Sequence, residues 1–583
     1  MRRTKIVATI GPACDDLETL REIFLRGVDV ARLNFSHGNH EEHRKRIEKI
    51  KKLREELKIP IAIMLDTKGP EIRLLDFKDN KKVNLKAEET FILTTREVLA
   101  DDKIASVSYK NLPRDIKVGA KILIDDGLVG LKVQKISGED IYTVVENGGE
   151  ISSHKGVNVP DTNLSLEALT ESDIEDLKFG VEMGVDFIAA SFVRTKEDIY
   201  NIRKVLEEAG DFSTLIISKI ESKSAMDNID EIIDASDGIM VARGDLGVEI
   251  ETEEVPIAQK QIIKKCNLKG KAVITATQML DSMMRNPRPT RAEANDVSNA
   301  VLDGTSAVML SGETAGGSFP VQAVETMRKI VEVTEKSMDF SQILQRKIEE
   351  ISNTTTNAIG KSTCQMARDL GVKLILTATT SGNTSRAISK FRPECLILAA
   401  TPDTKVRRQL NLEWGVKSIL LDNYEDIDLM ISEAIEEAKK ENYLSSGDKV
   451  IVTAGVPVGL SGSTNLIKIE NIEEIIARGT GLGNGKITAK AIVVNELNDL
   501  VNFFKNGNII VSKFTNKEMM PYIKRSGGLV TEKAGYTSHG AVVGVSLGIP
   551  TIVGAKDIVE KIKTGEILSI NSSEGTISEG NSF

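Results

Sequence analysis

The sequence predicts an α/β protein in which a (β/α)8 TIM barrel is joined by three further domains. Two observations carry this prediction: eight short apolar runs separated by helical patterns, and one long gap in that series that holds strand-like runs instead. A chain of 583 residues is also too long for a single hydrophobic core, so three or four domains are expected.

Eight runs rich in β-branched residues mark the barrel strands. They are KIVATIG from Lys5, VDVARLNF from Val28, IPIAIMLDT from Ile59, VDFIAASF from Val185, TLIISKIE from Thr214, DGIMVARG from Asp237, KAVITATQ from Lys271 and TSAVMLSG from Thr305. Helical patterns separate them, as in DDLETLREIFLRG, where Asp15 or Asp16 would cap the helix and Leu17, Leu20 and Phe24 would share one face. Eight such units are typical of a closed barrel, and an open doubly wound sheet is the alternative.

The long gap interrupts the barrel, which is expected to comprise residues 1–67 and 156–344. Residues 68–155 contain strand-like runs separated by Asp-Asp-Gly and Asn-Gly-Gly turns. They predict a small β-barrel domain inserted after the third strand. Such a domain would lie over the mouth of the large barrel and act as a lid that excludes water.

Two further domains are expected after the barrel. In residues 345–472, apolar strands alternate with helices, which indicates an α/β domain with an open sheet. The run RGTGLGNGK from Arg478 has glycine at every second position and predicts a flexible linker. Residues 473–583 then form a fourth domain.

Composition limits the classes of partner and the compartment. A net charge of −10 argues against a nucleic-acid partner. The four cysteines, Cys14, Cys266, Cys364 and Cys395, are scattered, which fits a reduced cytoplasmic protein without a zinc site. No run of 18 apolar residues is present, so neither a signal peptide nor a membrane partner is expected.

Charged residues follow two neighbouring strands. Strand side chains alternate between faces, so Lys219 and Glu221 would point the same way, and Asp245 comes just after the next strand. A cation and two carboxylates suit Mg²⁺ held beside a phosphorylated substrate. An ordinary surface ion pair is the alternative.

Polar residues also end several other strands, where the active site of such a barrel lies. Arg32 and Lys219 are anion-binding types, and Asn34, Ser36, Asp66 and Thr67 would suit a monovalent cation. Thr275 and Thr277 end the seventh strand. Five strands that all end in polar residues predict a functional site, and without an activated serine or cysteine covalent catalysis is not expected.

The motifs ARLNFSHG, LDTKGPEIR, ISKIES, MVARGDLGVE, TATQMLDSM and AVMLSGETAGG, in that order, resemble the pyruvate kinase family over residues 1 to about 330. The region to about residue 470 is similar to the C-terminal regulatory domain of that family. The resemblance implies phosphoryl transfer from phosphoenolpyruvate to ADP, which gives pyruvate and ATP, in a glycolytic enzyme that is a homotetramer.

The resemblance also implies roles for individual residues. Arg32, Lys219, Gly244, Asp245 and Thr277 would bind substrate, with Arg32, Lys219 and Thr277 catalytic. Glu221 and Asp245 would hold Mg²⁺ (or Mn²⁺), and Asn34, Ser36, Asp66 and Thr67 would hold K⁺. Asn34, His37, Arg73 and Lys155 would face the nucleotide.

Two positions depart from the family pattern. Thr195 stands where animal members carry a nucleotide-contacting lysine, which puts that contact in doubt. Glu71 stands where the K⁺-independent members tend to carry lysine, so we expect K⁺ dependence.

The predicted regulatory domain carries a candidate effector site in TTSGNTSR. Such a loop at a helix N-terminus is typical of an anion nest, although a plain capped turn is the alternative. The resemblance implies that a phosphorylated effector binds here, at Thr380, Ser381, Gly382, Asn383 and Thr384, opposite the loop from Gly455 to Gly462. That second loop has few cations, which favours a sugar monophosphate or AMP over a bisphosphate.

The tail, with TSHGA followed by GIPTIVG, resembles the swivelling phosphohistidine domain of phosphoenolpyruvate-utilising enzymes. The resemblance implies either a phosphorylated His539 or a domain kept for packing, and we favour packing. The rival functions are a metal-dependent barrel lyase or aldolase that acts on an enolpyruvate, and a phosphohistidine relay. A sensor of phosphorylated metabolites is a rival for residues 345–470 alone.

Overall fold

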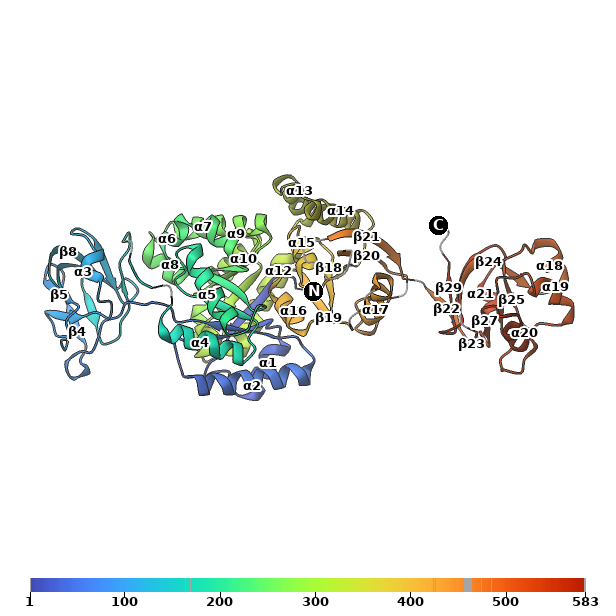
Figure 1. Ribbon diagram of the computed structural model, residues 1–583, viewed down its shortest axis with the longest axis horizontal. Coiled ribbons are helices and arrows are strands. Elements are labelled where there is room, and N and C mark those ends of the chain that lie inside the picture. The colour runs from blue at the N-terminus through green and yellow to red at the C-terminus, as the bar shows by residue number, and fades with distance from the viewer. Residues whose placement is uncertain are drawn as a thin grey trace. The chain divides into compact units, whose positions relative to one another are not determined.

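The computed structural model describes residues 2–580 except 163, 168, 423, 425, 446, 456–463, 473 and 484, together with the backbone but not the side chain of residue 80 (Figure 1). The chain divides into two compact units, residues 1–434 with 452–468 and residues 435–451 with 469–583, and each is described by itself. Within the described residues, no helix is long and apolar enough to cross a membrane.

The first unit contains a closed barrel of eight parallel strands in the order β1-β16-β15-β14-β13-β12-β3-β2. The strands are β1 (Lys5–Thr9), β2 (Val30–Asn34), β3 (Ala62–Asp66), β12 (Phe187–Ala190), β13 (Leu215–Ile220), β14 (Gly238–Ala242), β15 (Ala272–Ala276) and β16 (Ala307–Leu310). The closed order confirms the predicted barrel and excludes the doubly wound alternative.

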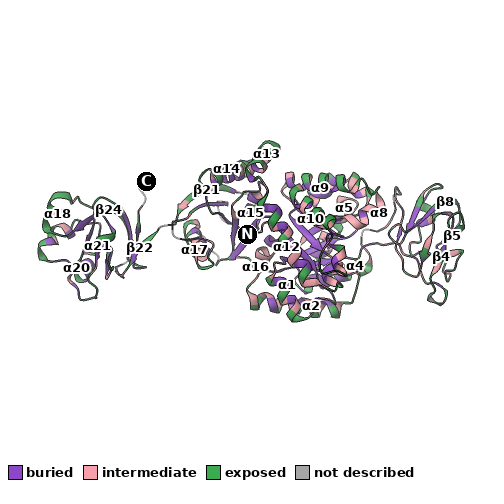
Figure 2. Ribbon diagram, turned by 180° about the vertical axis from the view of Figure 1, so that it is seen from behind, coloured by how far each residue is buried: buried purple, intermediate pink, exposed green. Residues whose placement is uncertain are grey.

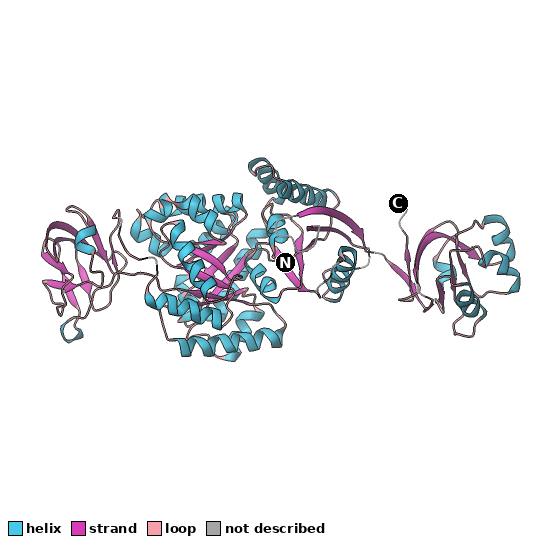
Figure 3. Ribbon diagram, in the orientation of Figure 1, coloured by secondary structure: helices cyan, strands magenta, loops and turns pink. Residues whose placement is uncertain are grey.

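Helices surround this barrel (Figure 3). The longer ones are α1 (Leu17–Leu25), α2 (His40–Leu57), α4 (Glu171–Glu182), α5 (Lys196–Glu208), α7 (Ile229–Ala235), α9 (Val255–Lys269), α10 (Arg291–Asp303) and α12 (Pro320–Lys336). In α1 the Asp16 side chain accepts from the backbone N–H groups of Glu18 and Thr19, as a capping residue should. Leu20 and Phe24 are buried as predicted, but Leu17 is 38% exposed, and Ile23 takes its place on the inner face.

The barrel strands are buried on both faces, as Figure 2 shows. Val7, Met64 and Phe187 belong to a cluster inside the barrel, while their strand neighbours Ile6 and Ile63 pack in the layer with the helices. Leu412, from the short helix η3 (Leu410–Leu412), joins the interior cluster. The regulatory part of the chain therefore packs against the floor of the barrel.

The inserted domain consists of β4 (Val83–Leu85), β5 (Thr90–Thr94), β6 (Ile104–Ser106), α3 (Leu112–Asp115), β7 (Lys121–Ile124), β8 (Val129–Ser137), β9 (Asp140–Asn147), β10 (Gly149–Ile151) and β11 (Val157–Asn158). Six strands form one sheet in the order β11-β7-β8-β9-β5-β6. Bridges from Arg73 to Gly156 and from Leu74 to Val107 join the two ends of this order. The result is a small β-barrel with its own core around Phe91.

The regulatory part has a sheet in the order β19-β18-β17-β20-β21. These strands are β17 (Leu374–Ala378), β18 (Leu396–Thr401), β19 (Val416–Leu420), β20 (Lys449–Gly455) and β21 (Thr464–Asn471), and the helices are α13 (Phe340–Glu350), α14 (Thr355–Asp369), α15 (Asn383–Ser389), α16 (Thr404–Gln409) and α17 (Ile427–Lys440). Ion pairs of Arg408 with Asp186 and of Lys405 with Asp211 connect it to the barrel.

The second unit contains an eight-stranded sheet in the order β22-β29-β28-β24-β25-β26-β27-β23. Its elements are β22 (Ile475–Arg478), β23 (Thr480–Leu482), β24 (Lys486–Val494), α18 (Leu497–Phe503), β25 (Ile509–Ser512), α19 (Met520–Ile523), β26 (Gly528–Thr531), α20 (His539–Leu547), β27 (Thr551–Val553), α21 (Ile558–Lys561), β28 (Ile567–Asn571) and β29 (Thr576–Glu579). With this sheet, the predicted fold class is confirmed for all four parts of the chain.

The predicted flexible linker is wrong, because the segment contains β23 of this sheet. Gly481 lies in β23, and a Cβ atom there would stand 1.8 Å from the Ser572 carbonyl oxygen. A Cβ at Gly479 would stand 2.6 Å from the Val553 carbonyl oxygen. Glycine at these positions permits close approach of two backbones rather than flexibility.

Candidate active site

Lys219 and Glu221 stand at the end of β13 and point into the mouth of the barrel, as their spacing predicts. The Lys219 Nζ lies 2.8 Å from Glu221 Oε1, and both side chains are buried. The other oxygen of Glu221, Oε2, accepts from the Phe192 backbone N–H at 2.6 Å. The glutamate is therefore fixed by two partners.

Asp66, at the end of β3, joins two cations. Its Oδ2 accepts from Arg32 Nε at 2.6 Å and its Oδ1 accepts from Lys219 Nζ at 3.1 Å. Arg32 also donates from Nη1 to Thr9 Oγ1 at 2.9 Å. The ends of β2, β3 and β13 thus place two anion-binding side chains around one carboxylate.

Asp245, Gly244 and Thr277 form the other side of the site. Asp245 lies in the first turn of α8 (Arg243–Glu249), and the Gly244 backbone N–H donates to Thr277 Oγ1 at 2.8 Å. Thr277 has a φ of +65°, a left-handed conformation that is unusual for a β-branched residue. Such strain is typical of residues held in place for function.

Arg243 holds this strained turn. Its guanidinium donates from Nη2 to the Thr277 carbonyl oxygen at 2.7 Å and from Nη1 to Asp296 Oδ2 at the same distance. Arg243 was not predicted from the sequence, although this residue directly follows β14 and lies two residues before Asp245. Ser191, whose Oγ accepts from Lys219 Nζ at 2.7 Å, was not predicted either.

The charges of the site shift one another's pKa values. Burial would lower the pKa of Lys219, but Asp66 and Glu221 raise it above the ordinary value. Burial would raise the pKa of Asp66, but Arg32 and Lys219 hold it below the ordinary value. Burial raises the pKa of Glu221 and that of Asp245, although Lys219 opposes both shifts. The two acids with raised pKa values, Glu221 and Asp245, therefore share the positive charge of Lys219.

The donor set fits a divalent cation. Asp245 is half-buried at the cavity, yet no hydrogen-bond donor or basic side chain of the described residues contacts its carboxylate. A cation beside Asp245 and Glu221 would offset the cost of burying this acid. The described residues hold no cluster of three or more acidic, histidine or cysteine ligands, so a metal here would keep positions for substrate and water.

The four residues predicted to hold a monovalent cation lie on two paired strands and the turn after one of them. Asn34 is the register partner of Asp66 between β2 and β3, and its Oδ1 accepts from the Ser36 backbone N–H. Thr67 Oγ1 accepts from the Ser191 backbone N–H at 3.1 Å. Mostly neutral oxygens around one carboxylate fit K⁺ in type.

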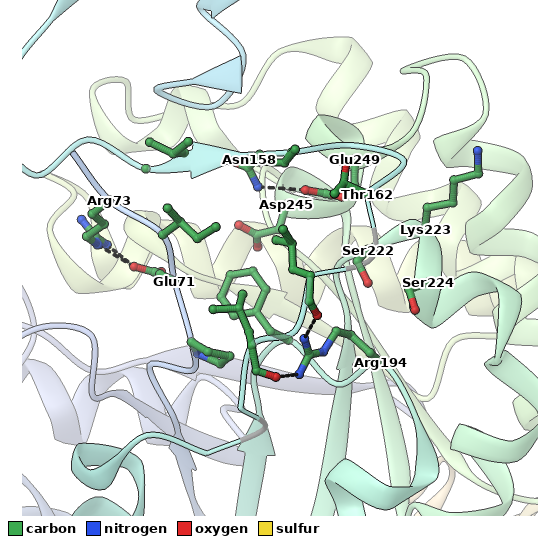
Figure 4. Close-up of a pocket in the computed structure, with 18 of the residues that line it drawn as sticks. Glu71, Arg73, Asn158, Thr162, Arg194, Ser222, Lys223, Ser224, Asp245 and Glu249 are labelled. Carbon is green, nitrogen blue, oxygen red and sulfur yellow. Dashed lines mark hydrogen bonds and ion pairs between the residues drawn. The ribbon is translucent and has the colours of Figure 1, made fainter. Parts of the chain in front are cut away.

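A cavity of about 740 Å³ extends from Asp245 between the inserted domain and the barrel (Figure 4). Arg73 and Lys155 line it, and Figure 4 shows Asp245 pointing into it from the far side. Arg73 Nε donates to Glu71 Oε2 at 2.6 Å, and Lys155 Nζ donates to Asp125 Oδ1 at 2.8 Å. Basic side chains therefore line a cavity of the size that small ligands occupy.

The four predicted nucleotide contacts fall into two groups. Arg73 and Lys155 lie in the cavity, whereas Asn34, the last residue of β2, and the exposed His37, on the turn that follows, do not line it. Within the described part of the chain, no hydrogen bond or ion pair joins the two groups. Thr195, the residue that departs from the family pattern, is the N-cap of α5.

The predicted effector loop connects β17 to α15, as expected. Gly382 has a φ of +83°, and its N–H donates to Thr379 Oγ1 at 2.9 Å. Arg386 donates from Nη1 to the Ser381 carbonyl oxygen, while its buried Nη2 has no hydrogen-bond partner among the described residues. This arginine ends the TTSGNTSR motif but was not among the predicted effector contacts. Of the opposite loop, residues 456–463 lie outside the described residues.

His539 begins α20 in the second unit. Its Nδ1 lies 2.8 Å from Thr515 Oγ1, and Ser538 caps the helix. His539 is half-buried, and the contact with Thr515 engages one ring nitrogen within the domain.

Comparisons with known proteins agree with this architecture. Residues 1–324 match the family of the pyruvate kinase barrel domain, and residues 357–470 match the pyruvate kinase alpha/beta domain. Together they span well over half of the chain. The chain belongs to the pyruvate kinase family.

The remaining matches extend that assignment. Residues 504–575 match the mobile domain of PEP-utilising enzymes. The chain is 46% identical to a pyruvate kinase of Sporosarcina psychrophila over 100% of this chain and 99% of that protein, and 46% identical to one of Geobacillus stearothermophilus over 99% of each. A solved pyruvate kinase from Cryptosporidium parvum is 40% identical, with a TM-score of 0.77, over 81% of this chain and 96% of that chain. The family and the enzyme class that the sequence predicted are confirmed.

Proposed function

We propose that this enzyme transfers the phosphoryl group of phosphoenolpyruvate to ADP and releases pyruvate and ATP, with Mg²⁺ (or Mn²⁺) and K⁺ as cofactors. The observation that carries the proposal is the pair of cations, Arg32 and Lys219, which share Asp66. Lys219 also acts electrostatically on the carboxylate of Asp245, which has no hydrogen-bond or ion-pair partner among the described residues. Phosphoryl transfer needs alignment and neutralised charge more than a nucleophile from the protein, and this arrangement supplies both.

The reaction breaks the bond between phosphorus and the enol oxygen and forms a bond from phosphorus to an oxygen of the ADP β-phosphate. Arg32 binds the phosphoryl oxygens, and Lys219 stabilises the transferring group and the enolate that it leaves. Glu221 and Asp245 would hold the divalent ion, which would supply positive charge to neutralise the phosphate groups.

The enolate then gains a proton at its methylene carbon. Thr277, whose Oγ1 is held against the Gly244 N–H, stands beside that carbon, and a chain of water molecules delivers the proton. The Gly244 backbone and Asp245 lie against the substrate. Proton transfer at carbon followed by release of pyruvate completes the balance.

The nucleotide and the monovalent ion occupy neighbouring positions. Arg73 and Lys155 contact the nucleotide phosphates from the inserted domain, and Asn34 and His37 contact the nucleotide from the barrel. Asn34, Ser36, Asp66 and Thr67 hold K⁺, which is needed because Glu71 adds negative charge near Asp245.

A coupled pyruvate assay with Mg²⁺, with and without K⁺, tests the proposal. Pyruvate should form only when ADP is present, and activity should fall strongly in buffer free of K⁺ and Na⁺. Pyruvate released without ADP would instead favour the lyase or aldolase. Full activity without monovalent ions would refute the K⁺ requirement alone.

We also propose that a phosphorylated metabolite, a sugar monophosphate or AMP, regulates the enzyme at Thr380, Ser381, Gly382, Asn383 and Thr384. The Nη2 of Arg386, which has no hydrogen-bond partner in the part of the chain that the structure describes, supports this, because a phosphate on the loop would satisfy it. The same assay under a panel of effectors tests it, and Arg386→Ala should abolish the response.

Family membership supports two further properties, a homotetramer and a place in cytoplasmic glycolysis. Analytical ultracentrifugation of the full chain tests the first. A sedimentation coefficient that fits a monomer at micromolar concentration would refute it.

A further inference from the structure

A second cavity, of about 360 Å³, lies away from the mouth of the barrel. Its walls come from α13, α14, the segments 371–373 and 393–395, and Arg3. It shares no residue with the predicted effector loop or with the proposed active site. The function proposed above therefore leaves it unexplained.

The walls combine positive charge with apolar surface. Arg3, Arg368 and Lys373 are basic, and Glu394 is the only acidic residue among those that line the cavity. The carboxylate closest to Arg368 is the adjacent Asp369 at 3.2 Å, on the exposed side. Phe340 and Leu344 provide the apolar wall. This pattern fits a small anion with an apolar body.

Two cysteines, Cys364 and Cys395, also line the cavity, which raises the alternative of a redox switch. Burial raises the pKa of Cys395 to about 12 and that of Cys364 well above its ordinary value. The thiolate, which is the reactive form, is therefore disfavoured at neutral pH. The two thiols act here as apolar wall.

Arg3 links this cavity to its surroundings. Its backbone N–H donates to the Glu335 carboxylate, its guanidinium donates to the Glu394 carbonyl oxygen, and its own carbonyl oxygen accepts from the Gly415 N–H. The guanidinium also lies 4.4 Å from the Phe340 ring centroid. A ligand on Arg3 would therefore act on both the barrel and the regulatory domain.

From Phe340 the contacts continue toward the effector loop. The Phe340 and Trp414 ring centroids are 6.1 Å apart, and Glu413, next to Trp414, pairs with Arg386 at 2.9 Å. Trp414 is the single tryptophan of the chain. It lies between the cavity and the arginine of the effector loop, and its fluorescence reports on both.

We propose that this cavity binds a small organic carboxylate with a short apolar body, and that the bound ligand changes the response of the enzyme to its phosphorylated effector. The carboxylate lies on Arg3 and Arg368, and the apolar body lies along Phe340 and Leu344. The binding step stands on the cavity alone, whereas the regulatory step rests on the function proposed above.

Binding is tested with hexanoate and its neutral, equally shaped amide, neither of which absorbs where tryptophan is excited. Hexanoate should change Trp414 fluorescence and slow the modification of Cys395, the one cysteine of the chain that is not buried, by methyl methanethiosulfonate. Hexanamide should bind at least tenfold more weakly. No protection of Cys395 by hexanoate, or equal protection by both probes, would overturn the proposal.

Variants of the cavity distinguish hexanoate binding at this site from binding elsewhere on the protein. Arg368→Ala should weaken hexanoate binding about tenfold, which corresponds to one strong charged contact. Ala367→Leu, which fills the cavity, should abolish it. Arg346→Ala removes an exposed arginine of α13, another helix of the cavity wall, at a position that does not line the cavity, and should leave binding unchanged. If hexanoate bound equally well to both cavity variants, the site would lie elsewhere.

The regulatory step has its own readout. Hexanoate should shift the effector concentration for half-activation in the full chain, and should not do so in Ala367→Leu. Protection of Cys395 without any such shift would refute the regulatory part while the binding part stands. Absence of kinase activity would refute the proposed function, and Cys395 protection would still test the cavity.

Discussion

Lys219 is buried between two carboxylates, Asp66 and Glu221, at the end of a barrel strand. The lysine therefore stays charged in a place where an isolated ammonium would lose its proton. A charge of fixed position can stabilise a moving phosphoryl group without reorganisation of solvent. The proposed transfer reaction therefore relies on this side chain.

Lys219→Met should lower kcat about 10³-fold, because it removes the cation that faces the transferring group. Steady-state kinetics, with circular dichroism as a check of folding, measure the effect. Lys204→Met, at an exposed lysine of α5, is the matched control and should keep full activity. A kcat within tenfold of the parent would show that the ammonium is not needed.

Glu71→Lys should reduce the stimulation of activity by K⁺, because it replaces negative charge near Asp245 with a fixed positive charge. The measurement is the ratio of kcat in K⁺ to kcat in tetramethylammonium. Glu97→Lys, at an exposed position of the same inserted domain, should leave that ratio unchanged. An equal ratio in parent and Glu71→Lys would contradict the explanation.

At the scale of residues, the sequence predicted those side-chain directions that the alternation of a strand determines. Lys219 and Glu221 are two residues apart on one strand, so their common direction follows from local geometry. Ser191 and Arg243 contact the site through other strands, and nothing in their local sequence reveals those partners.

At the scale of elements, β23 shows where composition misleads. Alternating glycines are typical of linkers, but the cause here lies in a backbone that is distant in sequence. The Ser572 carbonyl oxygen occupies the space that a side chain at Gly481 would need. The eight barrel strands, by contrast, were predictable because each has its own apolar run and a regular interval to the next.

Gly481→Ala should destabilise the C-terminal sheet by about 1–3 kcal/mol, because the new methyl group must push the two backbones apart. Chemical denaturation followed by limited proteolysis of that unit measures it. Thr480→Ala, the neighbouring position in β23, shortens a half-buried side chain and should cost clearly less. Equal stability of both variants would mean that the close approach is absent.

At the scale of the whole molecule, stability depends on contacts between domains within the first unit. Lys5 starts the first barrel strand, is fully buried, and donates from Nζ to the Val416 carbonyl oxygen of β19 at 2.5 Å. Burial lowers its pKa to about 7, although Asp29 opposes the shift. Such a contact was not predictable, since the two strands are 411 residues apart.

This lysine should make stability depend on pH. Between pH 7 and about 10.5 the unfolded chain holds a proton on Lys5 that the folded chain lacks, so the free energy of unfolding should rise with pH by up to about 1.4 kcal/mol per unit. Denaturation of the parent and of Lys5→Met at pH 7.0, 8.0 and 9.0 isolates the effect. A difference between them that does not change with pH would contradict the shifted pKa.

His539→Ala should leave kinase activity within twofold of the parent, because every residue of the proposed transfer site precedes residue 278. A coupled pyruvate assay on the full chain measures this. Loss of all ADP phosphorylation would instead favour the phosphohistidine relay. Phosphohistidine found after incubation with labelled phosphoenolpyruvate would reverse our preference for a packing role.

In the eight-stranded sheet of the C-terminal unit, β22 pairs antiparallel with β29, from Ile475 opposite Ser578 to Arg478 opposite Thr576. The module therefore enters and leaves through the same edge. Its two ends could be tethered by a short peptide and new ends opened in a surface turn, which would give a circular permutant with the same core. For the same reason it could be spliced into a loop of an unrelated host.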